Sequence, residues 1–315
     1  MCGVRGEILR AEDIADWTPS EPLDYDSAGR QQREEGDENN EDDEDDYEDE
    51  DGLDSVQASE RAQKKRKLEK EDIARLNLLV PNVELATGCS PNNLPGGPPT
   101  VQAQVLVQRL LSLLHTADII PLSKLRIWND ASVNATSTAG IIAEAEEEME
   151  DAEQEGLGKR EVKAFWVLYI DIMFLSLSGP PLDCAWLAML AALRNTRLPR
   201  ALWDTDKGGV ICDPDPGVAA ELELRDLPIA LTCGMFVEEG GSAVAREERR
   251  KWILADLDGF EEGLCRETIT VTVGKRGRPL RIEKSGGGGV GGKEVRGIVE
   301  VAEKWRRQCV ELLES

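Results

Sequence analysis

The residues that could do chemistry fall into three groups, and the first is a run of glycines. Residues 286–293 read GGGGVGGK and match the spacing G-x-x-x-x-G-K from Gly287 to Lys293. A phosphate-cradling loop with this spacing continues with Ser or Thr, whose hydroxyl holds magnesium. Glu294 stands there instead, and its negative charge would repel phosphates. We therefore interpret the run as a turn before the last helix, with a nucleotide site as the alternative.

The second group is a cluster of carboxylates in the stretch LADLDGFEEG. Its members are Asp256, Asp258, Glu261 and Glu262. Paired carboxylates can bind a metal or act as general acid and base. Acidic residues also occur in exposed turns between strands, so the cluster alone leaves both interpretations open.

The third group would supply a nucleophile or a path for phosphate. The chain has one histidine, His115, and none of its seven cysteines form a C-x-x-C pair. A zinc site and a histidine-activated nucleophile are therefore not expected, and we predict no metal and no cofactor. Arg194, Arg197 and Arg200 could line a phosphate path, but an exposed helix end explains them equally well.

The net charge of −25 is concentrated in two segments. Residues 31–54 carry fifteen acids and one base, and residues 144–155 carry eight acids and no base. Because these segments hold −22 of the total, the rest of the chain is close to neutral. An evenly acidic surface would argue against a nucleic-acid partner, whereas two acidic segments do not.

Long polar stretches separate the parts that can fold. Residues 16–77, acidic and then basic, and residues 129–159 cannot bury enough apolar area to offset the entropy of ordering, so we predict two disordered insertions. Lys64, Lys65, Arg66 and Lys67 form a basic run within the first insertion. This run is either a solvated charge cluster or a nuclear import signal.

The apolar pattern elsewhere predicts an α+β domain of sheet and helices. Residues 164–177 are nearly continuously apolar, as in a central strand buried on both faces. We expect Asp183 to cap the helix that follows, which ends near Arg194. Further elements are expected at the N-terminus (a strand), at 100–120 (a helix), and at 219–224, 228–236 and 252–256 (strands).

Two patterns near the C-terminus are regular. TITVTV alternates strictly, which predicts a strand with Ile269, Val271 and Val273 facing inward and the threonines between them facing outward. A last helix is predicted from an apolar stripe at helical spacing. Its members are Val295, Ile298, Ala302, Trp305, Cys309 and Leu312.

Six stretches occur in an order that is similar to a known family. They are LLVPNVEL, QAQVLVQRLLSLLHTADII, WVLYIDIMFLSLSG, LDCAWLAMLAALRNTRLP, LPIALTCGMF and LADLDGFEEGLCRETITVTV. Together they resemble the RNase PH-like ring subunits of the eukaryotic RNA exosome. The resemblance implies an RNase PH-like (ribosomal protein S5 domain 2-like) β-α sandwich, with a remnant strand in residues 1–15, the rest of the first half in 78–128 and the second half in 160–315. It also implies opening strands ahead of CGVRGEI that this sequence lacks.

Active relatives carry D-x-x-x-x-D-G-G-T-R-T on the central strand and the turn after it. By resemblance, the first aspartate matches Asp171, and the catalytic aspartate falls on Ser176. The two glycines fall on Leu177 and Ser178, and the turn that holds phosphate falls on Gly179, Pro180 and Pro181. The resemblance thus implies a chain without the charge that phosphorolysis requires.

We therefore expect a non-catalytic exosome ring subunit that supports 3′-to-5′ RNA degradation and ribosomal RNA processing. Its expected partners are other RNase PH-like ring subunits, cap subunits and single-stranded RNA threaded through the ring, in the nucleus, nucleolus and cytoplasm, and no membrane is expected. Arg109, on the polar side of its helix, is the candidate RNA contact. Two alternatives stay open: a phosphate-dependent 3′-to-5′ exoribonuclease, and an acidic chaperone-like protein that binds basic partners.

Overall fold

The computed structural model describes residues 1–14, 50–90, 93, 97–129, 161–205, 207–237, 250–287 and 290–314, with side chains described outside residues 50–60. The acidic insertion predicted at 129–159 lies outside these residues except at Asn129, and so does the acidic centre of the first insertion. Within the described part, no helix combines the length and the apolar character needed to cross a membrane.

Strand β4 (Glu161–Phe174) is the centre of the first sheet. It pairs antiparallel with β1 (Cys2–Arg10) on one side, and on the other it pairs parallel with β2 (Leu79–Leu85) and antiparallel with β3 (Arg126–Asn129). Its continuous apolar sequence fits this position, because a strand with neighbours on both sides and packed faces buries nearly every side chain. The predicted central strand is thus confirmed, although it ends at Phe174.

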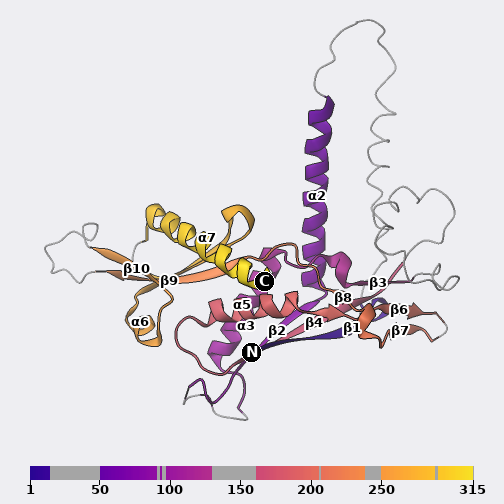
Figure 1. Cartoon of the computed structure of the whole chain (residues 1–315), viewed down its shortest axis with the longest axis horizontal. Helices are drawn as coiled ribbons and strands as arrows, with labels where there is room; N and C mark the ends of the chain where they lie inside the picture. Colours follow the sequence, from indigo (N-terminus) through magenta and orange to yellow (C-terminus); the bar gives the residue numbers. More distant parts are fainter. Residues whose placement is uncertain are drawn as a thin grey trace, which may run out of the picture.

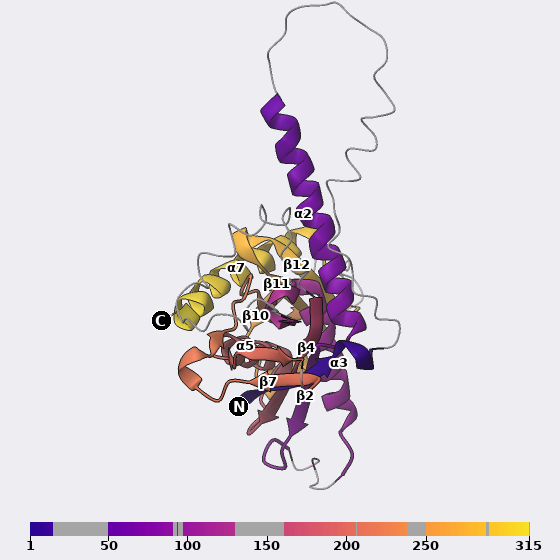
Figure 2. The same ribbon diagram turned by 90° about the vertical axis from the view of Figure 1, so that its right-hand side faces the viewer.

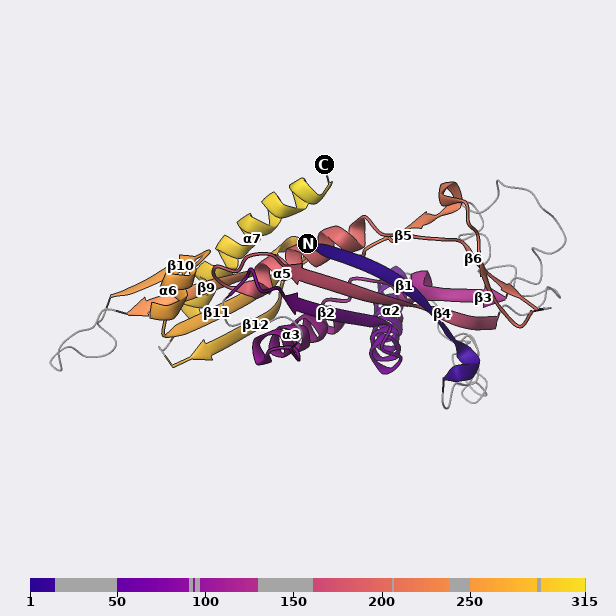
Figure 3. The same ribbon diagram turned by 90° about the horizontal axis from the view of Figure 1, so that it is seen from below.

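A second, antiparallel sheet is formed by the C-terminal half in the order β10 (Lys251–Ala255), β9 (Ile229–Val237), β11 (Glu267–Val273) and β12 (Pro279–Gly286). Helix α7 (Gly292–Glu314) packs on β9 and β11 (Figures 1 and 3). Two shorter pairs, β5 (Arg197–Leu198) with β8 (Ala220–Glu221) and β6 (Ala201–Asp204) with β7 (Gly209–Cys212), lie outside both sheets.

Helices α3 (Val101–Ala117) and α5 (Pro181–Arg194) join the two sheets. Helix α5 packs on β1 and β4 of the first sheet and on β9 of the second, while α3 packs on β2 and β12. Trp186 of α5 is fully buried and donates its indole N–H to the carbonyl oxygen of Pro228 at 2.7 Å. One continuous core therefore links both halves of the molecule.

The alternation of TITVTV has a different meaning from the one predicted. Ile269, Val271 and Val273 do face inward, and they pack against Ile298 and Ala302 of α7. Thr270 and Thr272, however, are only 5% and 2% exposed. The prediction that the threonines face solvent is wrong because the second face of this sheet is also covered. A threonine can be buried there because its hydroxyl can hydrogen-bond to a threonine on the neighbouring strand.

The basic run does not lie in a disordered segment. Residues Glu50–Arg75 form helix α2, which projects away from the sheets (Figures 1 and 2). Its lower end is docked, because Ile73 and the following Leu76 are buried in the core. Ala, Gln, Glu, Lys and Arg dominate the stretch and all favour helix, which explains why a sequence without an apolar stripe is helical. The prediction of disorder through residue 77 is therefore wrong for this last part.

Candidate functional site

The turn between β4 and α5 is the place where the resemblance puts phosphate chemistry. Asp171 lies near the end of β4, exposed, and accepts a hydrogen bond from the Asn82 side-chain amide of the neighbouring β2 at 3.1 Å. Ser176 is exposed in the turn itself. The first aspartate of the pattern is therefore held by its neighbouring strand, whereas the position of the second offers only a neutral hydroxyl.

Gly179 fixes the path of the turn. It is buried and has a φ of +86°, a conformation that residues with a side chain rarely adopt. A Cβ there would also clash with the carbonyl oxygen of Leu257. One residue earlier, the Ser178 hydroxyl accepts the backbone N–H of Gly259 at 3.3 Å. The turn is thus packed against the loop that follows β10.

Pro180 and Pro181 remove two of the backbone N–H groups that could hold an anion. Pro180 is the N-cap of α5 and Pro181 is its first residue. A helix N-terminus binds anions through its free backbone N–H groups, and proline has none. With no charged side chain from Ser176 to Pro181, the turn offers phosphate neither a cation nor its nearest amides.

The charge around the start of α5 is negative. Burial raises the pKa of Asp183, while hydrogen bonds from Thr232 and the charge of Arg109 lower it and the charge of Asp256 raises it further. Burial also raises the pKa of the neighbouring Cys184 thiol, with Asp183 and Asp256 adding to the shift. Two carboxyl groups therefore act on this end of the helix, which disfavours an incoming phosphate.

Asp183 does not cap its helix as predicted. Its two carboxylate oxygens accept from the backbone N–H of Thr232 at 2.6 Å and from the Thr232 hydroxyl at 2.7 Å. The correction has a simple cause: Asp183 is the third helical residue, on the side that faces β9, and the N-cap position is held by Pro180. The carboxylate of Asp183 therefore links helix α5 to strand β9.

A chain of polar contacts continues from this carboxylate. The hydroxyls of Thr232 and Thr270 lie 2.9 Å apart. Arg109 of α3 donates to the Thr270 hydroxyl at 3.3 Å and, through Nε and Nη2, to Glu283 Oε2 at 2.9 and 2.6 Å. The predicted RNA contact Arg109 thus has donors engaged between α3 and β12. This position favours a role in the fold, and contact with RNA stays a prediction.

Two carboxylates of the predicted cluster, Asp258 and Glu261, hold local structure. Asp258 caps α6 (Gly259–Leu264) by accepting from the N–H groups of Phe260 and Glu261, and Glu261 accepts in return from the N–H of Asp258 at 2.9 Å. This reciprocal arrangement is a capping box. No group of His, Cys, Asp and Glu in the described part of the chain could hold a metal ion.

The glycine run and the arginines also have structural partners. Glu294 accepts the N–H of Gly291 at 3.0 Å, so its carboxylate occupies the start of α7 where a nucleotide phosphate would have to lie. Arg194 donates to the carbonyl oxygen of Leu313 at 2.9 Å, and Arg197 pairs with Glu221 at 2.7 Å. His115 lies in the last turn of α3, and burial lowers the pKa of its imidazole.

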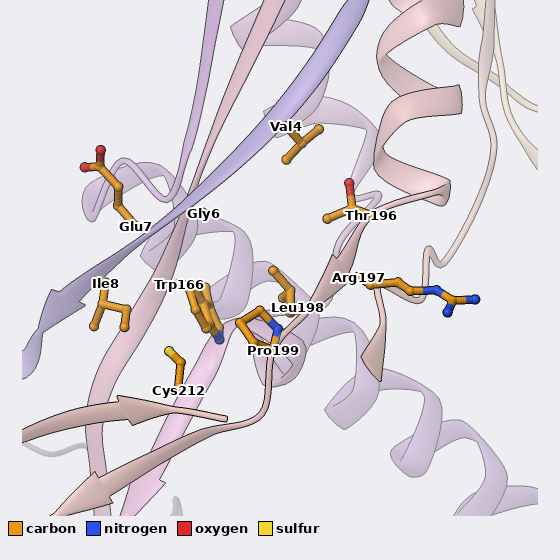
Figure 4. A pocket seen from close by; sticks show the side chains of 10 residues that line it. All are labelled: Val4, Gly6, Glu7, Ile8, Trp166, Thr196, Arg197, Leu198, Pro199 and Cys212. Carbon is orange, nitrogen blue, oxygen red and sulfur yellow. The ribbon is translucent and has the colours of Figure 1, made fainter. Parts of the chain in front are cut away.

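A pocket of about 590 Å³ lies beside β1 and not at the turn (Figure 4). Trp166, Leu198, Pro199 and Cys212 are among the residues that line it. Its two charged residues are committed elsewhere, because Glu7 pairs with Arg5 and Arg197 with Glu221. The pocket therefore brings together no acid, base or nucleophile set for chemistry.

The basic run lies far from the turn in sequence and on a separate element. Lys64, Lys65, Arg66 and Lys67 occupy consecutive positions of α2 and all four are exposed. The functional meaning of the run as an import signal stays a prediction. Sequence reasoning missed the contact of the turn with Leu257 and that of Asp183 with Thr232, since no local pattern links residues so far apart in the chain.

Comparison with known proteins gives consistent matches. Residues 53–199 match the sequence model of the 3′ exoribonuclease family, domain 1 (RNase_PH). Exosome complex component rrp43 of Schizosaccharomyces pombe is 29% identical over 224 residues, which cover 71% of this chain and 65% of that protein. Exosome complex component Rrp42 of Archaeoglobus fulgidus is 24% identical over 176 residues, covering 56% and 59%. The chain thus spans less than two thirds of the length of these two relatives.

Among solved structures, an Archaeoglobus fulgidus exosome with RNA bound to the active site aligns with a TM-score of 0.48. The alignment is 24% identical and covers 74% of this chain and 69% of that chain. The RNase PH-like fold, with mixed α and β content, is as the sequence predicted.

Proposed function

Since residues 53–199 carry an RNase PH-type domain, we propose that this chain is a non-catalytic subunit of the RNA exosome core ring. Its partners would be other RNase PH-like ring subunits and the cap subunits, with single-stranded RNA threaded through the assembled ring. In this role it supports 3′-to-5′ degradation and ribosomal RNA processing by forming part of the wall, in the nucleus, the nucleolus and the cytoplasm.

The residues of the turn after β4 are the reason for proposing that the chain is non-catalytic. Phosphorolysis needs positive charge or amide donors on the attacking phosphate and a carboxylate near the leaving group. Here Pro180 and Pro181 supply no N–H, Ser176 supplies no charge, and Asp183 and Asp256 add negative charge nearby. The fold of the enzyme family is kept while the groups that would do the reaction are absent.

Exposed apolar surface supports the part of the proposal that concerns partners. Trp252, Ile253 and Leu254 are 52%, 40% and 39% exposed on β10, the edge strand of the second sheet. Among the described residues, β10 pairs only with β9. Three consecutive exposed apolar residues on such an edge are an aggregation hazard in a free protein and are typical of a surface that a partner covers. A subunit of a permanent ring would bury such a surface.

The edge of the first sheet adds to this argument. Among the described residues β1 pairs only with β4, so its other side has no strand. The backbone N–H and C=O of Met1 bond to those of Met173. Because bonded pairs alternate along an antiparallel pair of strands, the residues at even positions of β1 direct their N–H and C=O groups away from β4. This open row of donors and acceptors is a second place where the proposed subunit would require a neighbour.

Affinity purification of the full chain from its own cells tests the proposal. We expect the other ring and cap subunits to co-isolate in equal amounts and to stay bound in moderate salt, as an obligate interface would. Recovery of basic nuclear proteins in place of ring subunits would support the acidic chaperone alternative and overturn the proposal.

A further inference from the structure

We propose that the middle of helix α2 is a binding site for the phosphodiester backbone of RNA. The site consists of Arg61, Lys64, Lys65, Arg66 and Lys67, here called the basic stretch. The choice of RNA among polyanions rests on the proposed function, and the experiment below separates the two claims.

The folded chain makes the basic stretch more positive than its sequence alone indicates. All five cations are exposed, and none forms an ion pair with a residue whose side chain is described. The acid next in sequence, Glu69, does not offset them, because it is buried and pairs with Arg225. This part of α2 therefore carries five exposed positive charges that form no ion pair with a described acid, and the nearest exposed described acid on the helix is Glu71.

The helix is held firmly at its lower end. Arg225 bonds to Glu69 of α2 and, at 2.7 Å, to Asp118 at the C-terminal end of α3. Lys70 donates to the carbonyl oxygen of Thr116 at 3.2 Å, and Ile73 is buried in the core. A preformed and anchored helix presents its charges without the ordering cost that a disordered basic segment would have on binding.

The arrangement of the charges suits contact with a nucleic-acid backbone and not recognition of a base sequence. Four consecutive helical residues point in directions about 100° apart, so Lys64–Lys67 surround the helix instead of forming one stripe. No aromatic residue occurs between Arg61 and Lys70, so stacking on bases is not available. The contact should therefore be to phosphates, independent of sequence and sensitive to salt.

An acidic protein segment is less well matched. Protein interfaces have an apolar centre, whereas the only large apolar side chain exposed here is that of Leu68, at 38%. The helix also projects away from the sheets (Figure 2). A flexible polyanion needs no apolar centre to bind.

The test uses the purified full chain and a fluorescent uridine oligomer about twenty nucleotides long, with binding measured by anisotropy over a range of salt concentrations. The variant is K64Q/K65Q/K67Q, and glutamine keeps the helix propensity. The matched control is K293Q/R296Q/K304Q, which removes the same charge from three exposed positions of another helix, α7. Circular dichroism checks that both variants keep their helix content.

We expect the triple variant in α2 to bind the RNA roughly tenfold more weakly. The slope of log affinity against log salt should become shallower by about 2, since each of three lost phosphate contacts with a single strand contributes about 0.7. The α7 control should keep the wild-type slope. A DNA oligomer of the same length should bind about equally, because the contact is to phosphates. Unchanged binding in the α2 variant, or an equal loss in the control, would overturn the proposal.

A polyglutamate peptide of similar length provides the second arm. Tighter binding of this peptide than of RNA at equal salt, lost in the α2 variant, would assign the stretch to an acidic protein partner and contradict our proposal. None of these measurements needs the ring. If ring subunits co-isolate while the α2 variant binds RNA normally, this inference alone fails, and if no ring subunit co-isolates the binding result still stands.

Discussion

Gly179 and Leu257 meet where the turn after β4 crosses the loop after β10, and the Leu257 carbonyl oxygen fills the space that a Cβ at residue 179 would need. The contact joins the position of the family's phosphate-holding turn to a loop about eighty residues later. It explains why this turn needs a glycine at position 179.

The first prediction concerns this contact. Gly179→Ala should lower the free energy of unfolding by about 3 kcal/mol, because it combines a φ of +86° with a clash against backbone. Gly208→Ala is the control: its φ is +58° but nothing lies within 4 Å of the added Cβ, so it should cost only about 1 kcal/mol. Urea unfolding measures both. Equal effects would show that the Leu257 contact is unimportant.

The second prediction concerns Asp183. Removing its carboxylate in Asp183→Ala leaves the N–H of the buried Thr232 without its acceptor, so the free energy of unfolding should fall by about 2 kcal/mol. Asp183→Asn keeps one acceptor and should cost less. Chemical unfolding at neutral pH checks the order, and an alanine variant as stable as the asparagine variant would contradict it.

The same residue predicts a pH dependence. Burial raises the pKa of Asp183 above its ordinary value of 3.8, so the folded state binds this proton more tightly than the unfolded state. The contribution of Asp183 to stability is therefore greatest at pH values below that ordinary value and is lost as pH rises through the raised pKa. The stability of the wild type relative to Asp183→Asn should therefore fall as the pH rises above the ordinary pKa of 3.8. A constant difference would argue against a raised pKa.

The third prediction separates two roles of Arg109. If its role is to pair with Glu283, then Glu283→Gln should destabilise the fold by about 1–2 kcal/mol, because it leaves the part-buried charge of Arg109 without its carboxylate. Arg109→Gln should cost less, because Glu283 keeps its ion pair with Arg281. If Arg109 also contacts RNA, only its own substitution should lower RNA affinity, since Glu283→Gln frees the guanidinium. Thermal unfolding and anisotropy on both variants decide between the roles.

The fourth prediction concerns the exposed edge strand. Trp252→Glu should reduce co-isolation with ring subunits several-fold while leaving the stability of the free chain within about 0.5 kcal/mol, as for most surface substitutions. Val101→Glu, at another exposed apolar position on α3, should leave co-isolation unchanged. Loss of assembly in both variants would point to general damage and not to a specific interface.

Several elements followed from local patterns in the sequence. The continuous apolar run of β4 predicts a buried strand, the alternation in β11 predicts a strand, and the stripe of α7 predicts a helix. All three elements are present. The stripe is wrong at Trp305 and Leu312, which are 39% and 74% exposed. In the last turn of α7, Val310 and Leu313 pack against the core instead. A periodic pattern predicts that a helix forms, but not which of its apolar residues are buried.

The remaining differences depend on contacts between distant residues. Asp183 has the residue type of a helix cap, but β9 brings Thr232 to it and a proline occupies the cap position. Thr270 alternates like an exposed residue, yet Arg109 of α3 covers it. Helix α2 has no apolar stripe, and its order comes from a few residues at its base and from Arg225. None of these partners is visible in a local stretch of sequence.

Phosphate-dependent release of nucleoside diphosphates from single-stranded RNA by the purified full chain is the most direct test of the account. The neutral, amide-poor turn at Pro180 and Pro181 and the hydroxyl at Ser176 predict no release above a blank without protein, at any phosphate concentration, while a phosphorolytic relative assayed in parallel shortens the same RNA. Release that rises with phosphate and is abolished by Ser176→Ala would contradict the central claim that this chain has kept the fold and lost the reaction.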